Sequence, residues 1–242
     1  TNATPEQIKQ CFRNARIIGR RFQIVHVRVG REIIEVTTFR RGHDEERSEQ
    51  DARASQSGRL LRDNVYGSLE EDARRRDLTI NALYLDPVNK LILDDLDGIE
   101  DIRQRLVRII GDPATRYNED PVRMLRVVRF AAKLGFTIEE TSQAAFGQCR
   151  HLLADIPAAR LFDETLKLFM AGFAAPTIEH LAKNGRLEPL FPEAIGAMNE
   201  PSSRSLILKA MANTDARIAR GKPVTPAFLL GALLWPAVAA KG

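Results

Sequence analysis

Cysteines, aromatic residues and long apolar runs are all scarce in this sequence. The 242 residues include two cysteines, Cys11 and Cys149, whose separation matches no metal-site spacing, and such a pair favours reduced thiols over a disulfide framework. No apolar run approaches the roughly 20 residues that a membrane-spanning helix needs. The first residues, Thr1–Glu6, lack the charged-then-apolar pattern of a secretion signal. We therefore expect a cytoplasmic protein without a membrane segment.

The chain has a mild positive excess, which does not by itself indicate a nucleic-acid partner. Lysine and arginine total 36 against 32 acidic residues. Arginine, however, occurs in clusters such as Arg74–Arg76. Its guanidinium fork binds phosphates and base edges at two points, whereas lysine acts as a point charge. The clusters are therefore a first indication of a phosphate-bearing ligand.

The two halves of the chain differ in pattern, which predicts an α+β fold. The first half mixes helix and strand signals: a helix start at Thr4–Pro5, a hairpin turning at Gly30–Arg31, a helix opened by a capping box at Ser68–Glu71 and running to about Leu83, and a strand–turn–strand over 84–96. Residues 41–58 are polar and charged, and we expect a mobile loop there. From Pro121 onward apolar residues recur at helical spacing, and no strand signal follows Ile110. Two predicted buried helix faces are Val122-Leu125-Val128-Ala132 and Leu161-Thr165-Leu168-Phe169.

Glu35 lies in the middle of a predicted strand, Ile33–Arg40, among apolar neighbours. Strand alternation sends Glu35 to the face opposite Ile34 and Val36. The simplest interpretation is a solvent-facing glutamate on an edge strand. The functional alternative is a carboxylate aimed across an open sheet face at a divalent cation, because Mg²⁺ prefers carboxylate oxygens held on rigid elements.

Charged and apolar residues are interspersed over residues 70–83. On a helix, Arg74, Asp77 and Asn81 would share one face. A solvated helix with internal ion pairs, each worth about 0.3–0.5 kcal/mol, explains the charges, but the apolar residues between them indicate partial burial. Arginine beside aspartate and asparagine also suits a nucleotide, with the guanidinium on the triphosphate and the carboxylate and amide on the ribose hydroxyls.

Asp120 and Pro121 open a predicted helix that is rich in arginine. Helix-capping rules explain the local pattern, with Asp120 as N-cap, Pro121 at the first position and the arginines as a solvated stripe. Asp120 and Arg123, three residues apart, also place an acceptor and a donor fork on one face. Such a pair can read adenine, the aspartate accepting from N6 and the arginine donating to N1, at about 1–3 kcal/mol of discrimination.

Taken in order, these segments resemble the class II nucleotidyltransferases, the family of bacterial poly(A) polymerases and CCA-adding enzymes. The matching motifs are the strand Glu35–Arg40 with its Thr-Phe-Arg ending, the Arg-Arg-Asp-x-Thr-x-Asn-Ala block at Arg75–Ala82, the Asp-x-x-Gly turn at Asp95–Gly98, and the Glu-Asp-x-x-Arg helix at Glu119–Ala131. They cover essentially all of residues 1–175, and several motifs in fixed order are more specific than any single one. The stretch Ile17–Val27 also resembles a signature of the poly(A) polymerase branch, which we therefore favour.

The resemblance implies a monomeric enzyme that takes ATP with Mg²⁺ and adds AMP to RNA 3′ ends. Its head would span residues 1–110 as part of a nucleotidyltransferase fold of mixed sheet and helices, the helical neck residues 111–175, and the start of the helical body residues 176–242. The arginine-rich helical half would contact the RNA backbone, with salt-dependent affinity. The residues implied are Glu35 as metal ligand and catalytic carboxylate; Asp77 and Glu70 as further catalytic candidates; Arg75, Arg76, Asp77 and Asn81 for triphosphate and ribose; and Asp120, Arg123 and Arg126 for the rest of the nucleotide. Helix capping also explains Glu70 and Asp72.

One departure from the family concerns the metal site. The family carries a glycine-rich turn and an Asp-x-Asp pair upstream of the residues equivalent to Thr1–Glu6, and this sequence begins two or three residues after that pair. Its apolar end at Leu229–Leu234 looks truncated as well. We therefore expect the chain alone to be inactive, with Glu35 as its remaining metal candidate. Two alternatives stay open: a CCA-adding enzyme, and a catalytically silent fragment that only binds nucleotide or RNA.

Overall fold

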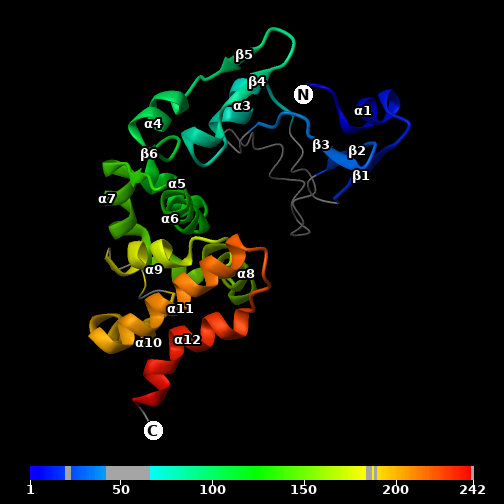
Figure 1. Ribbon diagram of the computed structural model, residues 1–242. Coiled ribbons are helices and arrows are strands. Elements are labelled where there is room, and N and C mark those ends of the chain that lie inside the picture. Colours follow the sequence, from blue (N-terminus) through cyan, green and yellow to red (C-terminus); the bar gives the residue numbers. More distant parts are fainter. Residues whose placement is uncertain (20–22, 42–65, 184–186, 188–189, 241–242) are drawn as a thin grey trace, which may run out of the picture. The chain divides into compact units, whose positions relative to one another are not determined.

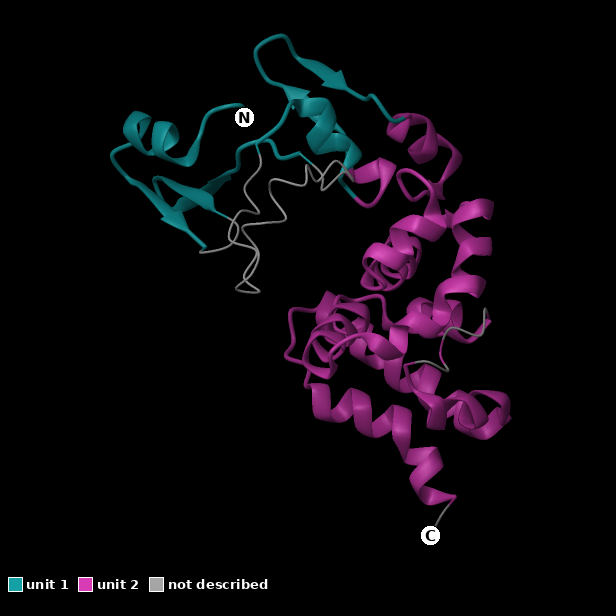
Figure 2. Cartoon of the chain, turned by 180° about the vertical axis from the view of Figure 1, so that it is seen from behind, with its two compact units in different colours: residues 1–76, 82–96 teal, residues 77–81, 97–242 magenta. Residues whose placement is uncertain are grey.

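The computed structural model describes residues 1–19, 23–41, 66–183, 187 and 190–240 (Figure 1). These residues form two compact units, one of residues 1–76 and 82–96 and the other of residues 77–81 and 97–242 (Figure 2). The loop predicted over 41–58 lies, from residue 42 onward, outside the described residues. No helix in the described ranges is long and apolar enough to cross a membrane.

The first unit opens with a helix packed on a small antiparallel sheet. Helix α1 (Pro5–Cys11) is followed by strands β1 (Ala15–Ile18), β2 (Ile24–Val29) and β3 (Glu32–Val36), in the sheet order β1-β2-β3. Thr4 starts the helix as predicted, since its hydroxyl accepts from the amide of Gln7 at 3.3 Å. The predicted hairpin is confirmed as well, with Gly30 at φ 62° in the turn.

The N-terminal residue pairs with the chain just beyond β3. The Thr1 amino group donates to the Thr37 carbonyl at 3.0 Å, and the Phe39 amide donates to the Thr1 carbonyl at 2.7 Å. A residue that bonds in this way to both neighbours of the residue opposite it forms a parallel bridge. Thr1 is therefore in parallel register with Thr38, whose hydroxyl donates to the Ala3 carbonyl at 2.6 Å.

The helix predicted to run from Ser68 to about Leu83 starts as expected but ends early. Helix α3 spans Leu69–Arg74 with a complete Ser68–Glu71 capping box. The predicted shared face of Arg74, Asp77 and Asn81 is therefore wrong. Residues 77–81 belong to the second unit, where the Thr79 amide donates to the Arg108 carbonyl and the Ile110 amide to the Asp77 carbonyl. These long-range backbone bonds replace further helical turns, and only the short 3₁₀ turn η2 (Thr79–Asn81) follows.

The first unit ends with the predicted strand–turn–strand. Strands β4 (Tyr84–Asp86) and β5 (Leu91–Leu93) pair in antiparallel fashion, Tyr84 opposite Leu93. In the turn between them the Asp86 carboxylate accepts from the amides of Val88 and Asn89 at 2.9 and 3.2 Å.

The second unit is almost wholly helical. Its elements are α4 (Gly98–Gln104), β6 (Leu106–Val107), α5 (Pro113–Glu119), α6 (Val122–Leu134), β7 (Thr137–Ile138), α7 (Glu140–Cys149), η3 (Arg150–Asp155), α8 (Ala158–Phe169), α9 (Ala174–Lys183), α10 (Pro192–Asn199), α11 (Pro201–Ala219) and α12 (Pro226–Ala239). The prediction of no strand after Ile110 is wrong at one point, because β7 pairs in parallel with β6. Two residues are too short to show alternation.

One continuous apolar core runs through this unit. Both predicted helix faces are confirmed, since Val122, Leu125 and Val128 on α6 are buried, as are Leu168 and Phe169 on α8. Leu78 is fully buried in the same core. The burial of Leu78 fixes the segment that carries Asp77 and Asn81 against the helices.

Candidate functional site

In the first unit, two of the predicted nucleotide ligands converge on a carboxylate. The Arg75 guanidinium donates from Nε and Nη2 to Asp72 Oδ1 at 2.9 and 2.6 Å, and Arg76 Nη2 donates to Asp72 Oδ2 at 3.2 Å. The backbone amide of Arg40 donates to the same Oδ1 at 3.0 Å. Asp72 itself is 3% exposed. Its role therefore differs from the helix capping expected of it, because Ser68 and Glu71 make the capping bonds.

Tyr84 completes the surroundings of this carboxylate. Its hydroxyl donates to Asp72 Oδ2 at 2.6 Å, and burial together with that bond raises the pKa of Tyr84 to about 12. Burial opposes the charge on Asp72, but the hydrogen bonds from Tyr84, Arg75 and the Arg40 amide outweigh it and lower the pKa of Asp72. Asp72 is thus ionised at neutral pH, and both of its oxygens can accept hydrogen bonds from the neighbouring guanidinium groups.

The cluster around Asp72 has an excess of positive charge. Burial and then the charge of Arg75 lower the pKa of Arg40, while the nearby charge of Asp72 acts to raise it. The Arg40 guanidinium itself donates from Nη2 to the Gln23 carbonyl at 3.2 Å. Three guanidinium groups around one buried carboxylate leave a positive surface. A polyanion such as a triphosphate would complete its charge balance.

Glu35 and Glu70 lie on the surface of the same unit. Glu35 sits on the edge strand β3, directly opposite His26 of β2, with 3.4 Å between His26 Nε2 and Glu35 Oε1 and 64% of its side chain exposed. Glu70 is exposed in the first turn of α3. Within the described part of the chain, no group of three or more histidine, cysteine, aspartate or glutamate side chains is arranged to hold a metal ion. Glu35 could supply one carboxylate ligand but not a complete site.

In the second unit, Asp77 lies between two arginines of α6. Its Oδ1 accepts from Arg123 Nε at 2.9 Å, and its Oδ2 forms an ion pair with Arg126 Nη1 at 2.5 Å. Arg123 is held further by the carbonyl of Arg116 at 2.8 Å and by the carboxylate of Glu119. Arg126 keeps one buried donor, Nε, that has no hydrogen-bond acceptor in the described residues.

Asp120 and Arg123, predicted to read adenine together, have separate partners. Asp120 Oδ2 accepts from Arg160 Nη2 of α8 at 2.8 Å, and its Oδ1 accepts from the Val122 amide at 3.2 Å. The predicted helix start is therefore partly confirmed, because the Asp120 carboxylate does bond the first turn of α6. Asp120 itself, however, is the C-cap of helix α5, which was not predicted, and Pro121 is the N-cap of α6. Asn81 is partly buried at the end of η2.

Sequence reasoning missed a polar network that holds the segment 77–81. The Thr79 hydroxyl donates to Asp101 Oδ2 at 2.6 Å, and Arg108 Nε donates to both oxygens of Asp101 at 3.1 Å. Arg108 also faces Glu139, with 3.5 Å between Nη1 and Oε1. Asp101 lies three residues beyond the Asp-x-x-Gly turn at Asp95–Gly98. No local signal indicates its partner Thr79, which is 22 residues away.

Comparison with protein families matches this chain in two places. Residues 1–108 match the family model described as "Poly A polymerase head domain", and residues 135–198 match "Probable RNA and SrmB- binding site of polymerase A". The chain belongs to the nucleotidyltransferase family of bacterial poly(A) polymerases and CCA-adding enzymes.

Individual relatives place the chain within this family. It is 47% identical to Poly(A) polymerase I of Haemophilus influenzae over 239 residues, which cover 97% of this chain and 53% of the relative. Poly(A) polymerase I of Escherichia coli O157:H7 is also 47% identical, over 97% of this chain and 51% of its own length. The CCA-adding enzyme of Enterococcus faecalis is 40% identical over 74% of this chain and 43% of the relative. The chain thus spans about half the length of these poly(A) polymerases, at 53% and 51%.

Solved structures confirm the α+β fold. The CCA-adding enzyme of Bacillus stearothermophilus in complex with CTP superposes with a TM-score of 0.63 and 24% identity, over 99% of this chain and 72% of that chain. A tRNA-processing enzyme in an apo form gives a TM-score of 0.69 and 22% identity, over 97% of this chain and 62% of that one. At these identities the likeness concerns the fold alone.

Proposed function

We propose that this protein is a polynucleotide adenylyltransferase, which transfers AMP from ATP to RNA 3′ ends without a template. The observation that carries the proposal is the 47% identity, along 97% of the chain, to relatives named Poly(A) polymerase I. The CCA-adding relative matches a smaller share of the chain, 74%. We further propose that the protein acts in the cytoplasm as a monomer, with the head, neck and body limits expected from the sequence.

The arginine cluster of the first unit is the proposed triphosphate site. Arg75 and Arg76 are fixed on Asp72, and their forks suit the oxygens of a polyphosphate. Phosphoryl transfer depends mainly on positioning and on stabilising negative charge, so cations held in advance contribute directly to turnover. Asp77 and Asn81 would then bind the ribose hydroxyls.

Asp120 and Arg123 are the proposed base-reading pair. Arg123 is held in place by Asp77 and Arg116, and Asp120 by Arg160. A donor and an acceptor held in this way match the adenine edge, which offers one acceptor at N1 and one donor at N6. Arg126 lies one turn further along α6 and 39% of its side chain is exposed, which supports its inclusion in this set.

Mg²⁺ is the proposed metal, with Glu35 as one ligand. The parallel register of Thr1 with Thr38 supports this, because in a longer chain continuing the same ladder the third residue before Thr1 would lie beside Glu35. In the family, the Asp-x-Asp pair occupies that region. When bound, the ion would neutralise the phosphate charge and lower the barrier to attack by the RNA hydroxyl. Glu35 alone does not complete the site, so we derive no step through the ion.

RNA is the proposed acceptor, bound through the helical half of the chain. The match of residues 135–198 to the family model for a probable RNA-binding site supports this assignment. Contacts to the phosphate backbone would make the affinity fall with salt concentration.

A CCA-adding enzyme is the second candidate, favoured by the 40% identity to such an enzyme over 74% of this chain. Primer extension by the enzyme that includes the residues upstream of Thr1 decides between the two. We expect ATP alone to give a long ladder of products and CTP alone to give none. Growth that requires CTP would contradict the first proposal, and failure of both nucleotides would favour the binding-only alternative.

A further inference from the structure

We propose that Asp72 is a positioning residue, which holds the guanidinium groups of Arg75 and Arg76 in the orientation that receives the triphosphate of the incoming nucleotide. The inference rests on the proposed function, since it names how one part of that site is built. Asp72 acts through its neighbours, because only 4% of its side chain is exposed and it cannot itself reach a ligand.

The bonds to Asp72 divide between its two oxygens. Oδ1 accepts from Arg75 Nε and Nη2 and from the Arg40 amide, while Oδ2 accepts from the Tyr84 hydroxyl and Arg76 Nη2. The donors come from the two residues that follow α3, from Arg40 in the segment after β3, and from Tyr84 of β4. One carboxylate therefore joins three separate parts of the first unit at the point where both arginines emerge.

Arg76 is fixed from more than one side. Besides its bond to Asp72, its Nε donates to the Tyr84 hydroxyl at 3.1 Å, and its guanidinium carbon lies 5.2 Å from the centre of the Tyr84 ring. Tyr84 is held in turn by an edge-to-face contact with Phe39, with ring centres 5.9 Å apart. Tyr84 therefore helps Asp72 to hold the Arg76 guanidinium in one orientation.

The arginines keep surface for a ligand despite these bonds. The exposed fractions of their side chains are 33% for Arg75 and 39% for Arg76, against 4% for Asp72. An arginine that is already held in one rotamer loses less freedom when it binds phosphate. A single carboxylate also leaves the group positive, so the bonds orient the cations without cancelling their attraction for a polyanion.

A purely structural role for Asp72 predicts a different outcome from a positioning role. Loss of a structural bond lowers the melting temperature and the fraction of active enzyme, but leaves the KM for ATP unchanged. Loss of positioning raises the KM for ATP, while the KM for the RNA primer stays constant.

The test compares Asp72→Asn and Tyr84→Phe with a control, Asp86→Asn, in the active enzyme. Asp86 is the last residue of β4, and within the described residues its carboxylate bonds to Val88 and Asn89 of the following turn. We expect Asp72→Asn to raise the KM for ATP about tenfold, because the loss in binding free energy should be about that of one hydrogen bond to a charged group. Tyr84→Phe should give a smaller rise, and Asp86→Asn none.

Binding of a fluorescent ATP analogue to this chain provides a second readout that needs no turnover. We expect the same order of affinities: wild type and Asp86→Asn tightest, Tyr84→Phe weaker, Asp72→Asn weakest. If Asp72→Asn does not fold, Tyr84→Phe decides, because it removes one hydroxyl and keeps the ring. Unchanged ATP affinity and KM in a folded variant would overturn the inference. A wild-type enzyme that binds ATP but never elongates RNA would contradict the proposed function instead.

Discussion

Arg123 on α6 donates from Nε to Asp77 Oδ1 at 2.9 Å, across 46 residues of sequence. The other oxygen of Asp77 pairs with Arg126, one turn further along the helix. The carboxylate of Asp77, the aspartate of the Arg-Arg-Asp block, therefore aligns two arginines of the Glu119–Ala131 helix motif. The bond joins two motifs that the sequence could only place in order.

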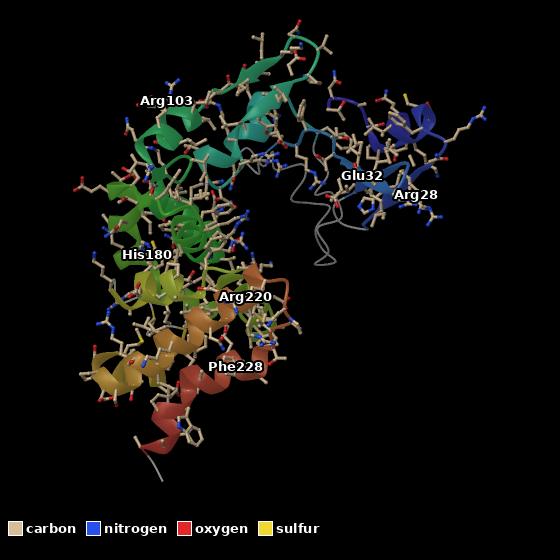
Figure 3. All side chains as sticks on the ribbon, viewed as in Figure 1. Arg28, Glu32, Arg103, His180, Arg220 and Phe228 are labelled. Carbon is tan, nitrogen blue, oxygen red and sulfur yellow. The ribbon has the colours of Figure 1, made fainter. Side chains whose placement is uncertain are left out.

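Replacing Arg123 tests the base-reading proposal. Arg123→Ala should weaken the preference of the enzyme for ATP over CTP by about 10- to 100-fold in kcat/KM, because one good base contact is worth about 1–3 kcal/mol. The measurement is the specificity constant for each nucleotide with a fixed RNA primer. Arg103→Ala is the control, since the ion pair that Arg103 forms in the described part of the chain is with Glu100, and 72% of its side chain is exposed (Figure 3). A loss of RNA affinity with unchanged nucleotide preference would refute the assignment.

Replacing Glu35 tests the metal proposal. In the enzyme that includes the upstream residues, Glu35→Gln should lower kcat at least about tenfold, because a neutral amide is a poorer ligand for Mg²⁺. The thermal melting temperature should stay the same, as the side chain is 64% exposed. Glu32→Gln, an exposed residue of the same strand, is the matched control. Full activity of Glu35→Gln at limiting Mg²⁺ would count against the role.

The chain itself offers a related prediction. The 242 residues should show no transfer of AMP, because no group of three or more histidine, cysteine, aspartate or glutamate side chains in the described residues could hold a metal ion. An enzyme that also includes the family's Asp-x-Asp segment should show transfer. Both proteins are assayed with ATP, Mg²⁺ and an RNA primer. Turnover by the shorter chain would show that the account of the metal site is wrong.

The buried network around Asp101 predicts a large effect on stability. Asp101→Ala removes the acceptor of Thr79 and Arg108, so we expect a loss of about 3 kcal/mol in the free energy of unfolding, typical of breaking a buried pair. The neighbouring Glu100 has 51% of its side chain exposed, so Glu100→Ala should change the free energy of unfolding by less than about 0.5 kcal/mol. Urea denaturation of both variants provides the comparison. Equal stabilities would show that the network is dispensable.

Glu139 predicts a specific dependence of stability on pH. Burial would raise the pKa of Glu139, but the amides and hydroxyls of Thr141 and Ser142 lower it to about 2. A glutamate in an unfolded chain titrates near pH 4.3. The stabilisation is therefore fully present above about pH 4.3 and is lost as the pH falls towards 2.

Glu139→Gln isolates that charge. At pH 7 the variant should be less stable by about 1 kcal/mol, and the difference from wild type should shrink as the pH falls from about 4.3 towards 2. The exposed neighbour Glu140 provides the control variant, Glu140→Gln, which should show no such pH-dependent difference. A difference for Glu139→Gln that stays constant with pH would contradict the assignment.

Features set by local chemistry could be predicted from the sequence. The capping residues Thr4 and Ser68 and the turn at Gly30 depend on residues next to one another, and the structure confirms them. The buried faces of α6 and α8 follow from helical spacing alone. Where long-range contacts decide, the predictions failed: α3 ends at Arg74 because the chain beyond it pairs with residues 108–110.

In the candidate site too, local motifs could be predicted from the sequence and long-range contacts could not. The motifs identify Arg75, Arg76, Asp120 and Arg123, but not what holds each of them. Asp120 meets Arg160 across 40 residues, and no periodicity or composition indicates such a pair. The role of Asp72 is hidden for a further reason, because an aspartate in the first turn of a helix already has a sufficient local explanation.

The sequence of the RNA ends that the enzyme makes tests the central claim most directly. The enzyme with its upstream residues is incubated with an RNA primer, Mg²⁺ and equal amounts of ATP and CTP, and the extended 3′ ends are sequenced. The proposed function predicts runs of adenosine of varied length, with cytidine at background level. Ends that stop after C-C-A would contradict it and identify a CCA-adding enzyme.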